Sequence, residues 1–179
     1  MSWKRSVLDK DAQQRVGDVL QGVVVDLIDL ALQGKQAHWT VKGPNFRSLH
    51  KQLDDMVEVA RDATDDLAER LSALGVAPDG CVQTVAHTTR LEAMPVGFHD
   101  WRAITDWISD RLAVCSHHLQ EAMCELDPID DVSTNMLQDV AQLIEKQLWM
   151  MQAHQGEADD PGQEDFERAA QEETTASHG

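Results

Sequence analysis

The sequence predicts an all-α protein, a four-helix bundle with a long crossover connection between its second and third helices. The chain is rich in Ala, Leu, Gln, Asp and Glu and has no Tyr and only 5 Pro, a composition that favours helix. Four long segments repeat apolar residues at intervals of three and four, as amphipathic helices do. The middle connection is much longer than the other two, which is typical of crossover bundles. With 179 residues, the chain can bury the core of one domain.

The first two helices are expected on either side of a Gly-Pro turn. The first starts near Asp9 or Asp11, either of which can cap it, and runs to Gly43-Pro44. The second runs from about Asn45 to Leu74, where "GVAPDG" stops it. Each carries one apolar face, made of Val16, Val19, Leu20, Val23, Leu27, Leu30 and Ala31 in the first and Leu49, Leu53, Met56, Ala60, Ala63, Leu67, Leu71 and Leu74 in the second.

The second half of the chain supplies the other two helices. The stretch "CVQTVAHTTRLEAMPVG" is a connection with room for one short helix. A third helix is expected from about Phe98 to Leu126, and a fourth from about Thr134 to Ala153, separated by the acidic turn "DPIDDVST". Apolar residues again recur on one face of the fourth helix, at Leu137, Val140, Ile144, Leu148 and Met151.

The ends of the chain differ from the bundle in composition. Residues 1–8 are expected to form a short arm, and residues 9–154 the single bundle domain. Residues 155–179 are acidic and almost free of apolar side chains, so a disordered tail is expected. No internal repeat or second domain is evident.

Charge and cysteine usage exclude several classes of protein. The net charge of −17 opposes binding to DNA and to anionic membranes. No apolar run is long enough for a membrane span or a signal peptide. Cys81, Cys115 and Cys124 form no C-x-x-C pair, which argues against a disulfide framework and favours the reducing cytoplasm.

The sequence contains five candidate metal ligands, which are His38, His50, Asp54, Asp65 and Glu69. The last four lie on one stripe of the second helix, because they are spaced by four, eleven and four residues. Along the helix axis, however, Asp54 and Asp65 stand about 16 Å apart at about 1.5 Å per residue. The two halves of this ligand set therefore cannot bind one ion within a single chain.

The halves can meet across a two-fold axis. Suppose that the second helix packs antiparallel against its copy near Val59 and Ala60. The end with His50 and Asp54 then faces the partner's end with Asp65 and Glu69, and two equivalent sites form. A di-metal site within one bundle would need inward Glu-x-x-His motifs, and no His has Glu three residues before it. Mixed imidazole and carboxylate ligands suit iron, zinc or manganese. The structural alternative is that the histidines bond across an interface and the acids are merely solvated.

The stretch "KQAHWTVKGPNFRSLHKQLDD", followed by "ARDATDDLAERL", resembles the miniferritins of the Dps family, the DNA-binding proteins from starved cells. The resemblance extends from the first helix through "LIEKQLWMMQAH". It implies a ferritin-like bundle assembled into a hollow dodecamer. It also implies ferroxidase centres, with room for two irons, in which His38, His50 and Asp54 come from one subunit and Asp65 and Glu69 from its two-fold mate.

The resemblance implies an activity as well. Members of the family oxidise Fe(II), typically with hydrogen peroxide, and store ferric mineral in the cavity, which suppresses hydroxyl-radical formation. Trp39 adjoins one ligand and Trp149 lies in the last helix, and family members place such tryptophans where they can take up a stray oxidising equivalent. The alternative role for both is packing in an interface.

Iron must also reach the centres. In the family, acidic pores on the three-fold axes near the start of the last helix supply it, and Asp127, Asp130 and Asp131 occupy that turn here. Asn135 stands where a further acid is expected. An Asp-rich turn is otherwise simply a good helix cap.

DNA binding, which the family name suggests, has little support in this sequence. Members that bind DNA usually use basic tails, whereas here the few N-terminal cations are opposed by Asp9 and Asp11 and the C-terminal tail is acidic. We therefore expect weak or absent DNA binding and a cytoplasmic iron-storage protein. The alternatives are a nucleoid-associated protein that compacts DNA, and a zinc- or manganese-binding cage without turnover.

Overall fold

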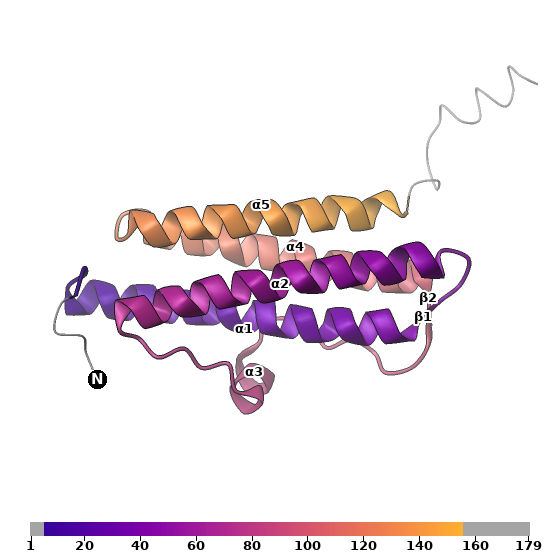
Figure 1. The fold of residues 1–179 in the computed structure, drawn as a ribbon, viewed down its shortest axis with the longest axis horizontal. Helices are drawn as coiled ribbons and strands as arrows, with labels where there is room; N and C mark the ends of the chain where they lie inside the picture. The colour runs from indigo at the N-terminus through magenta and orange to yellow at the C-terminus, as the bar shows by residue number, and fades with distance from the viewer. Residues whose placement is uncertain (1–5, 156–179) are drawn as a thin grey trace, which may run out of the picture.

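The computed structural model describes residues 6–155, so most of the predicted N-terminal arm and nearly all of the acidic tail lie outside the described residues. Four long helices lie side by side (Figure 1): α1 Lys10–Thr40, α2 Phe46–Leu74, α4 Trp101–Leu126 and α5 Asp131–Ala153. Helix α1 packs against α2 and α4, and α5 packs against α4 and α2. The predicted four-helix bundle is confirmed.

Helices α2 and α4 run in the same direction, so the chain between them must return along the length of the bundle (Figure 1). This crossover carries the expected short helix, α3 Val82–Thr88, which lies beside α1. It ends in a two-residue strand, β2 His99–Asp100, which pairs in parallel with β1 Val41–Lys42 after α1. The sequence analysis did not predict this pairing, which ties the end of the crossover to the turn between α1 and α2.

Aspartates cap three of the long helices. The Asp9 side chain accepts a hydrogen bond from the amide of Ala12, which decides between the two caps considered for α1. Asp100 caps α4, and because it also belongs to β2, this helix begins three residues later than expected. Asp130 caps α5, which therefore begins before Thr134.

Gly43 makes the turn between α1 and α2 possible. Its φ of +121° lies in the region that favours glycine, and a Cβ there would lie 2.6 Å from Cδ1 of Trp101. This turn places the end of α1 beside the start of α2, which is where three of the predicted metal ligands meet.

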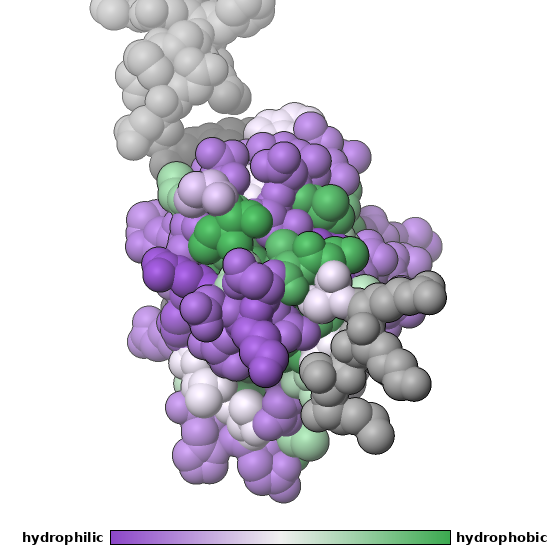
Figure 2. All heavy atoms as spheres, turned by 90° about the vertical axis from the view of Figure 1, so that its left-hand side faces the viewer, coloured by the Kyte–Doolittle hydropathy of each residue, from purple (hydrophilic) through white to green (hydrophobic). Residues whose placement is uncertain are grey.

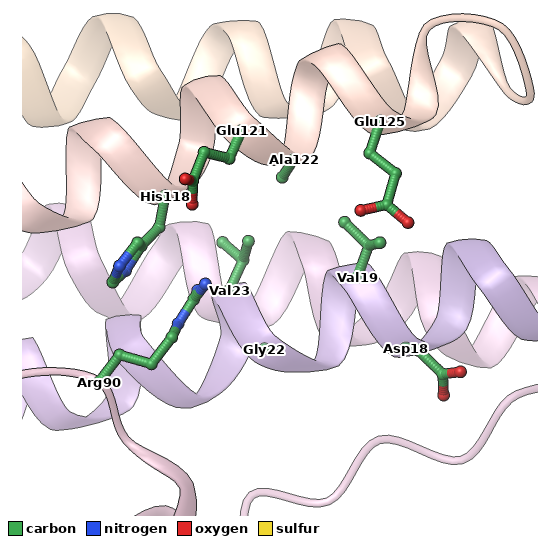
Figure 3. Close-up of a pocket in the computed structure, with 9 residues that line it drawn as sticks. All are labelled: Asp18, Val19, Gly22, Val23, Arg90, His118, Glu121, Ala122 and Glu125. Atoms are coloured by element: carbon green, nitrogen blue, oxygen red, sulfur yellow. The ribbon is translucent and has the colours of Figure 1, made fainter.

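Charged side chains fix the crossover to the bundle. The carboxylate of Asp26, buried in α1, accepts hydrogen bonds from the amide (3.1 Å) and Nε (2.9 Å) of Arg90, and lies 2.9 Å from Nδ1 of His118. Next to this network lies a pocket of about 340 Å³ between α1 and α4, and both Arg90 and His118 line it (Figure 3). Arg111, also buried, donates to the carbonyls of Glu92 and Ala93.

The core follows the predicted periodicity. Every apolar position named for α2 is buried, and so are those of α1 except Val19 and those of α5 except Leu148, which are partly buried. All three cysteines are free, Cys115 buried and the other two exposed. Among residues 6–155, no helix is long and apolar enough to cross a membrane.

Candidate metal centre

Three of the five predicted ligands meet where α1 ends and α2 begins. His38 lies in the last turn of α1, and His50 and Asp54 lie in the first turns of α2. One ligand atom from each lies within 4.8 Å of the others, a separation that a single ion can bridge. His38 is buried and the other two are half-buried, so the group is open to one side.

The two histidines fix each other's orientation. Nδ1 of His38 donates to the carbonyl of His50, and Nδ1 of His50 donates to the carbonyl of His38, both at 2.9 Å. The rings stack with their centroids 3.5 Å apart. Because each Nδ1 carries its proton toward a carbonyl, each Nε2 is left with a free lone pair. Nε2 is one of the two ring nitrogens through which a neutral histidine binds metals, and the two backbone carbonyls favour the tautomer that leaves it free.

Asp54 supplies the negative charge of the group. Its Oδ1 lies 3.2 Å from Nδ1 of His38 and accepts a hydrogen bond from Nζ of Lys35. That hydrogen bond is the main reason that the pKa of Asp54 lies below its ordinary value; burial opposes the shift, and the positive charge of Lys35 supports it. Asp54 is therefore ionised at neutral pH and ready to bind a cation.

The sequence analysis missed Lys35. The signal was present, because Lys35 precedes His38 by three residues and such residues share a helix face. Its significance depends on Asp54, which α2 brings to the same place, and that contact is visible only in the fold.

The other two predicted ligands do not join the group. Asp65 and Glu69 lie farther along α2 and are exposed. Within residues 6–155, the only cluster of three or more metal-ligating side chains is His38, His50 and Asp54. One chain thus forms half of the predicted site, and completion of the site by a second chain stays a prediction.

Apolar side chains are exposed beside the half-site. Trp39, next to His38, is 66% exposed, and Leu32 shares its face of α1 seven residues earlier. The exposed Phe46 ring lies 5.0 Å from that of His50. Trp149, on α5, is 65% exposed as well, and its place near the centre stays a prediction. Exposed aromatic rings around a metal cluster are typical of a surface that another chain covers.

The acidic turn at the start of α5 divides into two kinds of carboxylate. Asp127 and Asp131 are exposed. The turn between α4 and α5 lies at the left-hand end of the bundle in Figure 1, and Figure 2 shows this end as mostly hydrophilic with some hydrophobic residues. Asp130 is buried; its Oδ2 accepts from Nη2 of Arg70 at 2.7 Å and also binds Ser133. Asp130 therefore serves as a cap and ion-pair partner in the subunit, and only Asp127 and Asp131 have carboxylates free for an iron-entry role, which stays a prediction.

Comparison with known proteins identifies the family of the chain. A family model described as "Ferritin-like domain" matches residues 18–160. The "DNA protection during starvation protein" of Agrobacterium fabrum is 31% identical, over 82% of this chain and 91% of that protein. "DNA protection during starvation protein 2" of Deinococcus radiodurans is 33% identical, and the match covers 75% of this chain but only 56% of that longer relative.

Solved structures show the same fold. The structure of "Dps from Microbacterium arborescens in the high iron form" has a TM-score of 0.81 at 33% identity, covering 86% of this chain and 100% of that one. Dps of Mycobacterium smegmatis, in a tetragonal form, has a TM-score of 0.84 at 28% identity, covering 88% and 96% of the two chains. The bundle, the histidine–aspartate group and these relatives together show that the chain belongs to the Dps family of ferritin-like proteins.

Proposed function

We propose that this protein is a miniferritin that oxidises Fe(II) with hydrogen peroxide at centres shared by two subunits and stores the ferric product inside a hollow dodecamer. The observation that carries the proposal is the half-site: His38, His50 and Asp54 are held in ligating positions, while Asp65 and Glu69 stand exposed farther along α2. Iron is the substrate, not a resident cofactor.

An antiparallel pair of α2 helices joins the two halves in a single register. If His50 lies opposite the partner's Glu69, then Asp54 lies opposite the partner's Asp65, because each pair is spaced by four residues. A two-fold axis then creates two identical centres, each with two imidazoles and three carboxylates. Imidazole holds Fe(II), and the carboxylates neutralise the charge that grows on oxidation to Fe(III).

The same register has a second consequence midway between the centres. Ala60, which the sequence analysis placed at the helix contact, is fully buried inside the bundle. The exposed side chains on the stripe at that level are Glu58 and Arg61. The register that joins the ligands sets Glu58 of one chain opposite the partner's Arg61, so unlike charges face each other at the axis.

Two irons in one centre suit a two-electron oxidant. Each Fe(II) gives one electron, so two irons and two protons convert one hydrogen peroxide into two waters. A lone Fe(II) would reduce peroxide by one electron and release hydroxyl radical. The paired ligand set therefore supports the protective role that the family resemblance implies.

Peroxide-driven oxidation of Fe(II), followed by ferric absorbance, tests the proposal. The double variant with His50→Ala and Asp54→Ala is expected to lose the rapid phase by at least about tenfold, since half of every centre is missing. The matched control is His117→Ala, which removes an exposed histidine on α4 that contacts Glu121 and the ring of His118, and its rate should stay within about twofold. A wild-type rate in well-assembled double-variant particles would contradict the proposal.

The mass of the particles and the metal that they bind are measured on the same samples. A dodecamer should have a mass of about 240 kDa, twelve times the 20.0 kDa chain. A cage that binds zinc or manganese without turnover would bind metal yet show no rapid oxidation. A stable monomer at micromolar concentration would contradict both the cage and the shared centre.

We also propose that DNA binding is weak. Affinity for DNA comes mainly from cations that neutralise phosphates, and this chain carries a net charge of −17. A gel shift at low salt should show no tight complex, and a stable complex there would favour the nucleoid-compacting alternative.

A further inference from the structure

Lys35 occupies the carboxylate that iron would need. Its Nζ donates to Oδ1 of Asp54, the carboxylate that forms the metal-ligating group together with the two histidines. The Lys35 side chain is 27% exposed, so it lies largely against the protein and not in free solvent. The carboxylate of the half-site is thus already paired with a cation that belongs to the chain.

The ammonium and a divalent ion cannot share this carboxylate without cost. Both are cations that seek the same lone pairs, and they repel each other at the few ångströms that would separate them. The lysine stem is long and flexible, so the ammonium can swing toward solvent when an ion arrives. Binding of the ion is then an exchange of one cation for another.

We propose that Lys35 is a built-in competitor for the metal at Asp54: its ammonium holds the carboxylate when the centre is empty and must withdraw before that carboxylate binds the ion. This inference rests on the proposed ferroxidase function. It gives Lys35 a role in that function, since a centre that passes iron onward to a mineral must bind each ion weakly enough to release it. A competing ammonium lowers the affinity without removing a ligand.

Binding of Co(II) to assembled particles tests the competition, since Co(II) is stable in air and its visible absorption reports the ligands. Lys35→Met keeps the length of the side chain and removes its charge. Loss of the competitor is expected to tighten Co(II) binding on the order of tenfold by calorimetry. Lys35→Arg keeps a cation at the same place and should bind Co(II) within about threefold of wild type.

Lys51→Met is the matched control. Lys51 is exposed on α2 next to His50, so its removal changes the net charge equally and leaves Asp54 unchanged. The control should alter affinity by less than about twofold, because an exposed charge is screened. Unchanged or weaker Co(II) binding in Lys35→Met would overturn the inference, and so would equal tightening in the control.

Two further measurements separate the possible failures. Size exclusion and circular dichroism check that Lys35→Met assembles and folds, and Lys35→Gln replaces it if it does not. If wild type and His50→Ala bind Co(II) alike, then the proposed centre itself is wrong. If His50→Ala abolishes binding but the Lys35 variants match wild type, then only the competition is wrong.

Discussion

A single methyl group at Gly34 should disturb the metal centre through the packing of α1 on α2. Gly34 lies one turn before His38, and its backbone packs tightly against side chains of α2. A Cβ at this position would lie 2.7 Å from Cγ2 of Val57 and would also collide with the terminal methyl of Met56. The Met56 side chain can bend away at little cost, but Val57 is buried and β-branched, so its helix must move.

The size of the effect follows from two opposing contributions. Replacing Gly by Ala within a helix favours folding by about 1 kcal/mol. Overpacking a well-filled core costs about 1–3 kcal/mol. Gly34→Ala should therefore destabilise the subunit by about 1 kcal/mol, which lowers the unfolding temperature by about 3 °C for a domain of this size. A shift of α1 by a few tenths of an ångström also moves His38 away from Asp54, so Co(II) binding should weaken.

The matched control lies on the same helix. A Cβ at Gly22 would find its nearest neighbour, Nη2 of Arg90, at 3.8 Å, which is an ordinary contact. Gly22→Ala should therefore show the favourable contribution alone, with an unfolding temperature at or above that of wild type and unchanged Co(II) affinity. Calorimetry on assembled particles of both variants provides the comparison. Equal stability of the two variants would refute the packing argument.

We expect the buried carboxylates of Asp26 and Asp130 to stabilise the folded subunit. Asp26→Asn should destabilise the subunit by about 2 kcal/mol and speed hydrogen exchange of the Arg90 amide, which donates to Asp26. Burial alone raises the pKa of Asp130, but hydrogen bonds from Ser133 and Arg70 outweigh it and hold the pKa below its ordinary value. Ionised Asp130 therefore adds to the free energy of unfolding. This contribution is fully present above the ordinary pKa of a carboxyl group, and it is lost as the pH falls through the lowered pKa of Asp130 in the folded protein. The gap in unfolding temperature between wild type and Asp130→Asn should thus stay constant from about pH 7 to 5 and shrink below about pH 4, and a gap that does not shrink would contradict this assignment.

Local patterns were sufficient to predict the bundle. Apolar periodicity, the Gly43-Pro44 turn and the "GVAPDG" stop predicted the helices to within a few residues of their observed ends. The pairing of β1 with β2 could not be predicted, because two residues carry no strand periodicity and the partners are distant in sequence. For the same reason α4 was predicted to begin too early.

The site could be predicted only where neighbouring residues define it. His38 and His50 lie on either side of one turn, and the spacing of His50 and Asp54 already indicated a shared helix face. Lys35 and Asp130 were harder, because the role of each depends on a partner from another helix, Asp54 in one case and Arg70 in the other. Acidity alone suggested that Asp130 lines a pore, which stays a prediction; within the subunit its burial and contacts show a cap and an ion pair.

Co-assembly of two inactive variants tests the shared centre most directly. One variant carries His50→Ala with Asp54→Ala, and the other carries Asp65→Ala with Glu69→Ala. Each alone should form particles without rapid Fe(II) oxidation, since every centre lacks part of its ligand set.

Unfolding and mixing the two variants in equal amounts creates mixed pairs. In a mixed antiparallel pair, one centre collects both damaged halves and the other is wholly intact. Random mixing makes half of the pairs mixed, so about a quarter of the wild-type centres should return. Recovery of about a quarter of wild-type ferroxidase activity, with none in either parent, is the predicted result; persistent inactivity in well-formed mixed particles would contradict a centre built by two chains.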